Sequence, residues 1–309
     1  MAITHAAVKV KGERGYATEW NADHVIGDAD KPKVPVTVVV AAADSIGTTR
    51  ADYVCTATDD QDTINTALAA LGTTGGRVLL LEGTFQITAS ITIPQANIEL
   101  CGLGYGSRIL TNDNISMVRI ASHNHVAVRD LQIYGAGSGH NSNIGVHFSS
   151  SDYCMVTGCY ITNCGNVGIY TVTSMDYFTA YDNMVLSNVS HGMRLVDVHE
   201  GLVTNNLVSR NYGNGICIQN GINNVVSHNN ASENDYGNTA TYDGINLAGS
   251  SWNIVANNRC HDNDKYEINI WDAGCSKNLV HGNHARGGDH TGAINDAGTD
   301  TTLADNVTA

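Results

Sequence analysis

The chain has 309 residues, of which 42% are apolar, 6% aromatic and 15% charged, with 32 Gly and 3 Pro. This composition describes a folded, turn-rich protein and excludes a collagen-like or disordered chain. The 16 basic residues against 30 acidic ones give a net charge of −14, which argues against a nucleic-acid or anionic-membrane partner.

The N-terminal segment shares no pattern with the rest of the chain. Residues 1–50, which include Trp20-Asn21-Ala22-Asp23-His24, are expected to form a separate arm, and residues 51–309 a single domain.

The chain start lacks the basic, apolar and small-residue regions of a signal peptide, and no stretch approaches eighteen consecutive apolar residues. We therefore expect neither Sec export nor a membrane span.

One short helix is expected, over residues 59–72. Acidic residues precede an amphipathic run, and Gly72 stands at its end, which is typical of helix boundaries. The coil of strands described next needs such an element, because its first turn would otherwise expose core and an unpaired strand edge.

A short motif recurs along the second half of the chain. A Gly followed by an apolar residue opens an alternating run at intervals of 23, 24, 23, 29, 23 and 25 residues. The openings are Gly145, Gly168, Gly192, Gly215, Gly244, Glu267 and Gly292. An Asn recurs at the same period, in Asp182-Asn183, Asn205-Asn206, Asn229-Asn230, Asn257-Asn258, Gly282-Asn283 and Asp305-Asn306. Two markers with one period indicate a repeat protein.

Each repeat contains only stretches of three to five residues with apolar alternation, separated by Gly, Asn, Ser and Asp. A coil of parallel strands, with turns stacked about 4.8 Å apart, buries every apolar column of such repeats. The sequence therefore predicts an all-β fold, a parallel β-helix. The apolar residues one and three places after each leading Gly, such as Ile216 and Ile218, are expected in its core.

Two residue types in the repeats have expected structural roles. The recurring Asn is placed at a sharp turn, because Asn tolerates a left-handed backbone and its amide can hydrogen-bond along the stack. Cys159 holds this place in its own coil. The eight cysteines contain no C-x-x-C pair, so we interpret them as buried thiols.

Two segments carry a family resemblance. The run from Gly75 to Phe85, GGRVLLLEGTF, followed by IELCGLG at residues 98–104, resembles the opening of the pectate-lyase-like right-handed β-helix superfamily. This resemblance covers about residues 50–309. It implies a right-handed, single-stranded β-helix with three strands per coil and an Asn-bearing turn between the second and third. The ligand groove of the superfamily follows the first strand, which would be the Gly-led one.

The N-terminal arm adds a second resemblance. Its end, Trp20-Asn21-Ala22-Asp23-His24, is similar to the virion-proximal start of phage tail proteins. Together the two resemblances imply a tailspike-like polysaccharide depolymerase of viral or prophage origin. They further imply a homotrimer, located in the virion tail or released outside the cell.

The first candidate site is the outward column two places after the leading Gly. Its members are His147, Tyr170, Arg194, Cys217, Asn246 and Asn269. A cation that neutralises a uronate carboxylate, beside a phenol or imidazole that exchanges a proton, suits β-elimination or C5 epimerisation. We therefore interpret His147, Tyr170, Arg194 and Asp197 as catalytic, with His199, Asn246 and Asn269 binding substrate. The alternative is an exposed polar column without catalytic function.

The leading glycines and Glu267 extend this hypothesis. The stacked glycines are expected to form a groove floor without side chains, or to serve turn geometry alone. Glu267 replaces one of them, with Trp271 and Asp272 nearby, as further substrate-binding residues. Paired carboxylates there, with Asp243 and Asp296, also suit glycoside hydrolysis. The alternative is a solvated acidic end of the solenoid.

A third set forms a local cationic patch on the faces that flank the Asn turn. It contains His228 and His281, Arg259 above His284, and His261 above Arg286, with Glu233 one coil earlier. It is expected to bind an anionic glycan or a neighbouring subunit. His228 and His281 lie two coils apart, roughly 10 Å, too far to share one ion. No cofactor is expected, although a Ca²⁺ ion is compatible with the residues. The ranked hypotheses are an anionic-polysaccharide lyase, a glycoside hydrolase and a non-catalytic glycan-binding spike.

Overall fold

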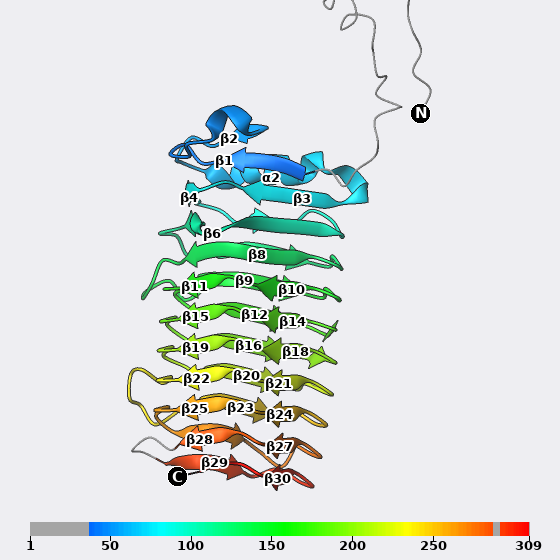
Figure 1. The fold of residues 1–309 in the computed structure, drawn as a ribbon, viewed down its shortest axis with the longest axis vertical. Helices are drawn as coiled ribbons and strands as arrows, with labels where there is room; N and C mark the ends of the chain where they lie inside the picture. The colour runs from blue at the N-terminus through cyan, green and yellow to red at the C-terminus, as the bar shows by residue number, and fades with distance from the viewer. Residues whose placement is uncertain (1–36, 287–290, 309) are drawn as a thin grey trace, which may run out of the picture. The chain divides into compact units, whose positions relative to one another are not determined.

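The computed structural model describes residues 37–286 and 291–308, and its chain winds into a parallel β-helix whose coils are stacked along one axis (Figure 1). The compact unit begins at Thr37, earlier than the expected boundary at residue 51. Strand β1 (Thr37–Ala41) pairs in parallel with β2 (Tyr53–Val54) and β3 (Gly76–Leu80) and so belongs to the end of the solenoid. The rest of the expected arm, with Trp20 and His24, lies outside the described residues.

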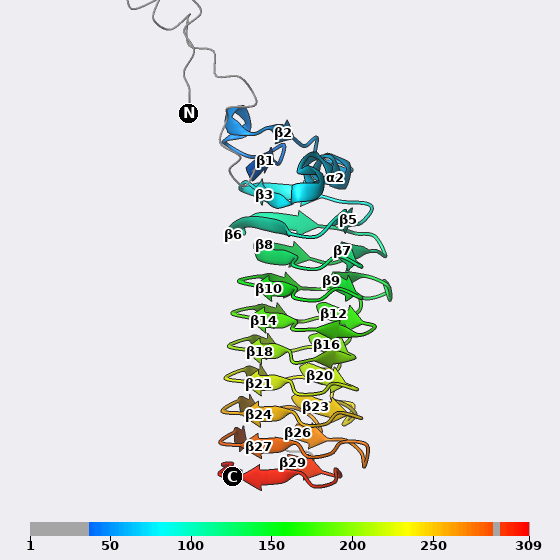
Figure 2. The same cartoon turned by 90° about the vertical axis from the view of Figure 1, so that its right-hand side faces the viewer.

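The predicted helix is confirmed as α2 (Asp60–Ala70), which covers the N-terminal end of the coil (Figure 2). Its apolar side is buried, and its polar side chains accept hydrogen bonds from strand-edge backbone. Asp60 Oδ2 accepts the N–H of Gln86 at 2.8 Å, and Asn65 Oδ1 accepts that of Thr92 at 2.9 Å. The helix therefore satisfies both needs of a solenoid end, a covered core and a paired edge.

The first strand of each coil belongs to a nine-stranded parallel sheet, here called sheet 1. Its strands are β5 (Ile91–Thr92), β7 (Ser116–Ala121), β9 (Ile144–Ser149), β12 (Ile169–Val172), β16 (Met193–Val196), β20 (Ile216–Gln219), β23 (Ile245–Ala248), β26 (Tyr266–Ile270) and β29 (Gly292–Asp296). From β9 onward these strands are the repeated runs that open with Gly or, in β26, with Glu267.

The second and third strands of each coil form two further columns, here sheet 2 and sheet 3. Sheet 2 contains β10 (Met155–Thr157), β14 (Thr179–Tyr181), β18 (Leu202–Thr204), β21 (Val225–Ser227), β24 (Ile254–Ala256), β27 (Leu279–His281) and β30 (Thr302–Ala304). Sheet 3 contains β4 (Gly83–Gln86), β11 (Tyr160–Thr162), β15 (Met184–Leu186), β19 (Leu207–Ser209), β22 (Asn230–Ser232), β25 (Arg259–His261) and β28 (His284–Arg286). The long strands β6 (Ile98–Leu110) and β8 (Ala127–Tyr134) run through both columns.

Short elements complete the fold. The 3-10 turns η2 (Thr48–Arg50) and η3 (Gly72–Thr74) flank the capping region. Strands β13 (Met175–Asp176) and β17 (Val198–His199) pair at the corner between sheets 1 and 2. None of the helices in the described residues is long and apolar enough to cross a membrane.

The predicted core columns are confirmed. Ile216 and Ile218 of β20 are fully buried, as are Ile245 and Leu247 on the next coil, and one continuous apolar core runs through the stack. All eight cysteines are free and buried. Burial raises the pKa of the Cys159 thiol to about 12, which makes it an inert part of the core.

Three columns of buried Asn side chains, here called Asn ladders, connect the coils, whereas the sequence indicated one. The expected ladder, between sheets 2 and 3, is Asn183, Asn206, Asn229, Asn258, Asn283 and Asn306. The others are Asn188, Asn211, Asn234 and Asn263, and Asn224, Asn253 and Asn278. Cys159 occupies the ladder position of its own coil, as predicted, and supplies no side-chain amide there; its backbone N–H donates to Asn183 Oδ1.

The expected reason for Asn at these turns is wrong in one respect. The left-handed backbone belongs to the residue before each ladder Asn, such as Asp182 with φ 56° or His228 with φ 57°. The ladder Asn itself points inward, where its amide pairs with the backbone of neighbouring coils. Asn is therefore required for its hydrogen bonds rather than for its tolerance of positive φ.

Candidate functional site

The outer face of sheet 1 carries the predicted column of polar side chains. Strand register aligns Arg119 with His147, His147 with Tyr170, and Tyr170 with Arg194 on successive coils. Cys217, Asn246, Asn269 and Asn295 continue the same column. The register of the strands on this face therefore agrees with the register predicted from the repeat.

Contacts join the upper part of the column. The rings of His147 and Tyr170 stack at 5.2 Å between centroids, and the Arg194 guanidinium carbon lies 5.7 Å from the Tyr170 ring centroid. Arg194 Nη2 donates to Gln219 Oε1 at 2.9 Å, which fixes the guanidinium along the face. All three side chains remain partly exposed, so this stretch combines a cation, a phenol and an imidazole at the surface.

His147 is held as a neutral imidazole. Its Nδ1 lies 3.2 Å from Ser116 Oγ, and its Nε2 is enclosed without a hydrogen-bond partner. Burial, with a smaller contribution from the charge of Arg119, lowers the pKa of His147. A neutral imidazole can accept a proton, but the enclosed Nε2 leaves the Tyr170 hydroxyl as the more accessible group.

Asp197, interpreted as catalytic, and His199, interpreted as substrate-binding, lie at the corner after β16. Asp197 occupies the turn after β16 with φ 53°, and His199 Nδ1 lies 3.3 Å from Asp176 Oδ1 in the β13–β17 corner. In the described residues no hydrogen bond joins either side chain to Arg194. The backbone turns away from sheet 1 at Asp197, so residues beyond it leave the face.

The leading glycines do not form a groove floor. A Cβ at Gly192 would lie 2.7 Å from Asn211 Nδ2, and one at Gly215 would lie 2.6 Å from Asn234 Nδ2, inside the coil. Each Gly therefore starts the strand with an inward position, followed at once by a second inward residue. Glycine is required there because the Asn ladder occupies the space of a side chain.

Glu267 follows the same rule and is not a groove residue. Its side chain is fully buried and accepts hydrogen bonds from the backbone N–H and the side-chain amide of Asn263. Its carboxylate takes the acceptor role that the next Asn would have in the ladder of Asn188, Asn211, Asn234 and Asn263. Glu267 therefore ends the ladder, and the expected contact with substrate is wrong.

The other two acidic-end candidates also have local roles. Asp272 Oδ1 accepts the N–H groups of Gly274 and Cys275 at 2.8 and 3.2 Å, so it stabilises a turn. Trp271 is half-exposed, and Lys265 Nζ lies 4.2 Å from its ring centroid. Only Trp271 of this group presents a surface for a ligand.

A buried polar network occupies the lower half of the sheet 1 face. Asp243 Oδ2 accepts the side-chain amides of Asn246 at 2.9 Å and Asn269 at 2.8 Å. Asn295 donates to Asn269 Oδ1 at 2.9 Å, and the Cys217 thiol lies 3.7 Å from Asn246 Oδ1. Asn246 and Asn269 are thus 4% and 1% exposed, which makes them a framework around Asp243 rather than open binding residues.

Asp243 has the properties of a proton-holding group. Its Oδ1 is enclosed without a hydrogen-bond partner, and the side chain is 1% exposed. Burial raises the pKa of its carboxyl, against the opposing effects of the Asn269 amide and Lys265. Raised carboxyl pKa values are a property of general acids.

Sequence reasoning missed the column to which Asp243 belongs. The residues before three of the leading glycines, His191, Asn214 and Asp243, occupy successive coils beside Arg194, Cys217 and Asn246 on the same face. Backbone bonds link this column, since Asn214 N–H donates to His191 Nδ1 at 2.9 Å. The available signal was periodic: polar residues precede the glycines of these three coils.

Comparison with known proteins agrees with the fold. A family model described as the right handed beta helix region matches residues 97–243. The chain folds as a right-handed parallel β-helix. This confirms the fold and the handedness that the resemblance implied. No curated protein sequence matches the chain significantly.

Solved structures give the same fold. The β-helix is similar to DFA-IIIase from Arthrobacter chlorophenolicus A6, solved in complex with GF2, with 16% identity, a TM-score of 0.63, and coverage of 87% of this chain and 79% of that one. The A-module of the mannuronan C-5 epimerase AlgE4 of Azotobacter vinelandii has 16% identity and a TM-score of 0.56, with 81% and 91% covered. Tailspike protein 2 of bacteriophage CBA120 has 12% identity and a TM-score of 0.64, with 80% and 40% covered.

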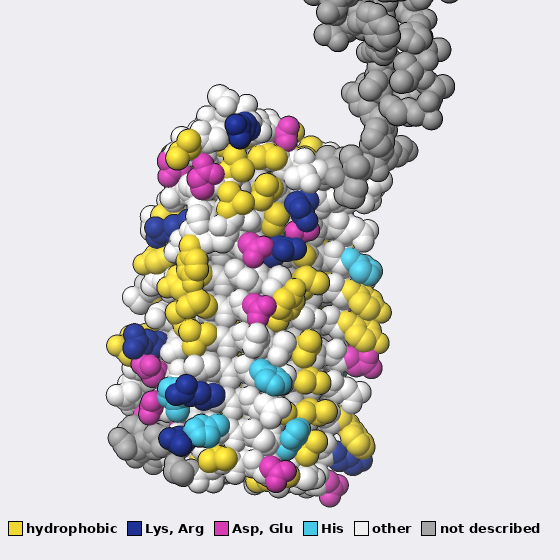
Figure 3. Space-filling model, viewed as in Figure 1, with side chains coloured by type: hydrophobic (Ala, Val, Ile, Leu, Met, Phe, Trp, Pro, Cys, Tyr) yellow, Lys and Arg dark blue, Asp and Glu magenta, His cyan; other side chains and the backbone are white. Residues whose placement is uncertain are grey.

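The β-helix also carries the predicted cationic patch. Register places Arg259 beside His284 and His261 beside Arg286, and basic and His side chains gather over β25 and β28 in Figure 3. A groove of about 440 Å³ lies beside the patch and is lined in part by Leu207, Arg210, Glu233 and His261. Arg210 is already paired with Glu233 at 2.8 Å, so the groove itself has little unpaired charge.

A ridge of stacked rings follows the corner between sheets 1 and 2 of the β-helix. His125, Tyr153 and Tyr177 stack at 5.0 and 4.8 Å, and all three have positive φ. Each ring covers the face of its neighbour, so the ridge presents mainly ring edges to solvent. It stabilises adjacent coils at turns where the backbone is left-handed.

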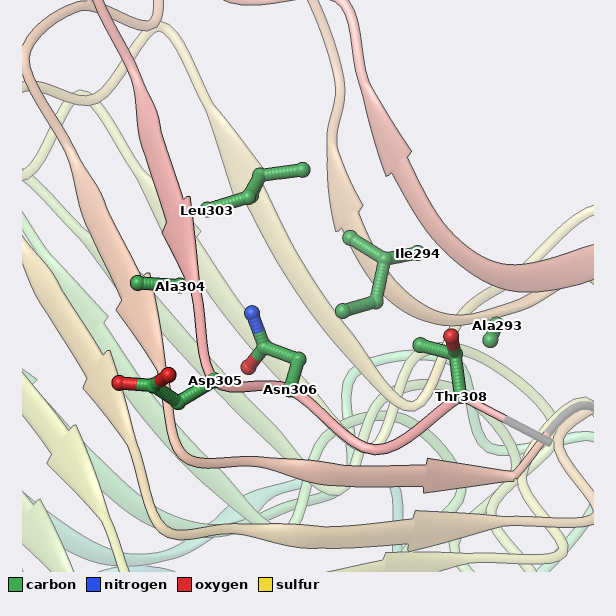
Figure 4. Close-up of a pocket in the computed structure, with 7 residues that line it drawn as sticks. All are labelled: Ala293, Ile294, Leu303, Ala304, Asp305, Asn306 and Thr308. Atoms are coloured by element: carbon green, nitrogen blue, oxygen red, sulfur yellow. The ribbon is translucent and has the colours of Figure 1, made fainter.

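The last coil of the β-helix leaves a cavity of about 450 Å³ between sheet 1 and sheet 2 (Figure 4). Ile294, Leu303 and Asn306 are among its lining residues, and Leu303 is 47% exposed. The cavity is an end of the core rather than a site with convergent polar groups. Within residues 37–286 and 291–308, no group of three His, Cys, Asp or Glu side chains could hold a metal ion.

Proposed function

We propose that this β-helix protein degrades a polysaccharide and that the outer face of sheet 1 is its substrate groove. The alignment of Tyr170 with Arg194, with the guanidinium over the ring, is the observation that supports this most directly. A flat sheet face with polar side chains at each coil suits an extended chain lying across the strands. The solved structures of similar fold, named after an epimerase, DFA-IIIase and tailspikes, are consistent with such a substrate.

The proposed reaction is β-elimination on a uronate-containing chain. A base removes the proton at C5 of the uronate, the C4–O4 bond breaks, and a C4=C5 double bond forms while the leaving oxygen takes up a proton. Arg194 stabilises the charge that grows on the substrate carboxylate, and Tyr170 transfers a proton at the reacting carbon. Neutral His147 supports the Tyr170 ring by stacking, and Arg119 provides a second cation on the same face.

The positions of the arginines on the sheet 1 face favour an anionic substrate. The protein has a net charge of −14, yet Arg119 and Arg194 stand on one face within three coils of each other. Each cation attracts a polyanion locally by its charge, and the surrounding negative surface disfavours binding elsewhere. Asp197 and His199, at the end of the same coil, would then contact the chain only at the edge of the groove.

Glycoside hydrolysis is the second candidate, and Asp243 is the observation that favours it. Its buried carboxyl, with a raised pKa, has the character of an acid that protonates a leaving oxygen. Glu267 and Asp272 cannot serve as its partner in the positions described above. This candidate therefore requires a partner carboxylate outside the network described here.

The substrate test uses purified protein and a panel of acidic and neutral polysaccharides. Products are followed both by the absorbance of unsaturated ends near 235 nm, an approximate assay wavelength, and by new reducing ends. Elimination gives both signals on an acidic substrate. Reducing ends without absorbance would favour hydrolysis at Asp243, and neither signal on a polysaccharide that binds would favour a glycan-binding spike.

The similar tailspikes also support a biological setting. We infer a homotrimer that acts in the virion tail or outside the cell, with residues 1–50 contributing to assembly. The fold similarity to tailspike protein 2 and the tail-like sequence around Trp20 favour this setting. No nucleic acid and no membrane is part of the proposal.

A further inference from the structure

His191 lies at the edge of the proposed groove in a single tautomer. Its Nδ1 accepts a hydrogen bond of 2.9 Å from the backbone N–H of Asn214 on the next coil. A backbone N–H can only donate, so Nδ1 must carry the lone pair. The proton of the neutral ring is therefore on Nε2, and the histidine offers an N–H donor of defined position.

The donor end of the ring is available. Nε2 has no hydrogen-bond partner in the described residues and is not among the enclosed unpartnered atoms, so it reaches the surface. Tyr242 packs its ring edge-to-face against His191, with 5.5 Å between centroids. Asp235 holds that tyrosine's backbone, since its Oδ2 accepts the N–H groups of Thr241 and Tyr242. The imidazole is thus fixed on both sides while Nε2 stays free.

The ring stays neutral because of its surroundings. Burial lowers the pKa of His191 to about 4, and the positive charge of Arg194 acts in the same direction. The backbone of Asn214 and the ring of Tyr242 are the other groups that contact the imidazole. His191 can therefore offer a hydrogen-bond donor near Arg194 without adding a second positive charge.

The combination defines a ligand chemistry. Arg194 has five N–H donors, and Gln219 accepts from one of its nitrogens in the described residues. The remaining guanidinium donors and a neutral imidazole N–H together match a group with two or more acceptor oxygens, and the positive charge of Arg194 favours an anion. We propose that His191 and Arg194 together bind one carboxylate of a uronate residue, with His191 Nε2–H donating to a carboxylate oxygen.

This inference rests on the proposed anionic substrate and adds a second donor to its carboxylate subsite. His191 contacts substrate in this account, so its loss weakens binding more than it slows the chemical step. A hydrogen bond to a charged group typically contributes about 1.5–3 kcal/mol, which corresponds to roughly 10- to 150-fold in affinity.

The first test uses the wild-type protein with ¹⁵N-labelled histidine. The ring nitrogens of His191, assigned by comparison with His191→Ala, should report the Nε2–H tautomer at pH 7, and Nε2 should shift on addition of a uronate trisaccharide. Trisaccharides of galacturonate, glucuronate and mannuronate are the probes, and their carboxyl-reduced counterparts should cause no shift. A protonated ring or an Nδ1–H tautomer at pH 7 would overturn the inference.

The second test compares variants by calorimetry with the same trisaccharides. His191→Ala should raise the dissociation constant roughly 10- to 150-fold, and Arg194→Ala should raise it at least as much. The control, Arg50→Ala, removes an exposed cation in the η2 turn outside sheet 1 and should leave the dissociation constant unchanged. In the cleavage assay His191→Ala should raise KM with little effect on kcat.

The outcomes separate the two proposals. If only Arg194→Ala weakens binding, His191 is no ligand and the proposed lyase function stands. If neither variant weakens binding of a uronate trisaccharide that the protein cleaves, the carboxylate subsite itself is wrong. If no uronate probe binds at all, the anionic substrate and this inference fail together. The NMR experiment remains decisive where His191→Ala does not fold.

Discussion

Asn229 Nδ2 donates a hydrogen bond of 3.0 Å to Oδ1 of Asn258 on the next coil. The same Asn258 oxygen accepts the backbone N–H of Asn229, and Asn229 Nδ2 also donates to the carbonyl of Val203. Both Asn side chains are 1% exposed. Each amide in the ladder therefore satisfies backbone groups that no water reaches, and it fixes the spacing and register of the coils.

Loss of one ladder amide should be costly. Asn229→Ala removes the acceptor of the buried Asn206 backbone N–H and the side-chain donor to the Val203 carbonyl, so the free energy of unfolding should fall by about 2–4 kcal/mol. Urea denaturation followed by circular dichroism measures the change. The control is Asn205→Gly, an exposed left-handed position, which should change stability by less than about 0.5 kcal/mol. Equal effects of the two variants would contradict the ladder account.

Glu267 should behave as a structural residue. Glu267→Gln keeps an oxygen that accepts from Asn263, so we expect a folded protein with activity close to wild type. Glu267→Ala removes that acceptor and should lower the unfolding free energy by about 1–3 kcal/mol. Thermal melts and turnover of both variants provide the measurement. Loss of turnover in a well-folded Glu267→Gln would return this carboxylate to the catalytic site.

His191 should make the fold sensitive to acid. Its folded pKa of about 4 lies below the ordinary value, so the unfolded chain binds a proton between these values and the folded chain does not. Stability should therefore fall as the pH drops from about 6.5 towards 4, and this residue should account for about 2 kcal/mol between pH 7 and 5. Urea midpoints of wild type and His191→Phe at both pH values test this. An unchanged pH dependence in the variant would contradict the buried neutral imidazole.

The assembly proposal is tested by mass. Full-length protein at micromolar concentration should give a trimer mass by light scattering, and a chain lacking residues 1–36 should shift towards monomer. That shortened chain retains the whole compact unit, which begins at Thr37. A monomeric mass for the full chain would rule the homotrimer out.

The strands and the outward column could be predicted because both follow the repeat period. Gly-led runs one coil apart must share a register, and alternation then places Tyr170 and Arg194 outside and Ile169 and Met193 inside. The orientation of the glycines could not be predicted by alternation, because the chain bends at Gly192 and two consecutive residues face inward. For the same reason alternation placed Glu267 on the outer face, whereas its side chain lies inside the coil.

The polar network and the tautomer of His191 depend on contacts that no spacing reveals. Asp243 and His191 stand directly before a leading Gly, where strict alternation would place them inside the coil. The two consecutive inward residues that follow put them on the outer face instead, and neighbouring coils and Tyr242 then enclose them. The hydrogen bond from Asn214 to His191 joins backbone to side chain across coils. Such contacts follow from three-dimensional packing, which converts an outward polar column into enclosed groups with shifted pKa values.

The most direct test of the proposed function is the rate of unsaturated-product formation by Arg194→Ala on the polysaccharide that the wild-type protein cleaves. The account predicts a folded variant whose turnover falls roughly 100- to 1000-fold, because a preorganised donor to the developing charge is lost. Tyr170→Phe should show a comparable loss, and Asp243→Asn a much smaller one. Near-normal turnover of Arg194→Ala and Tyr170→Phe, with loss of activity in Asp243→Asn, would contradict the lyase site and favour hydrolysis at the buried carboxyl.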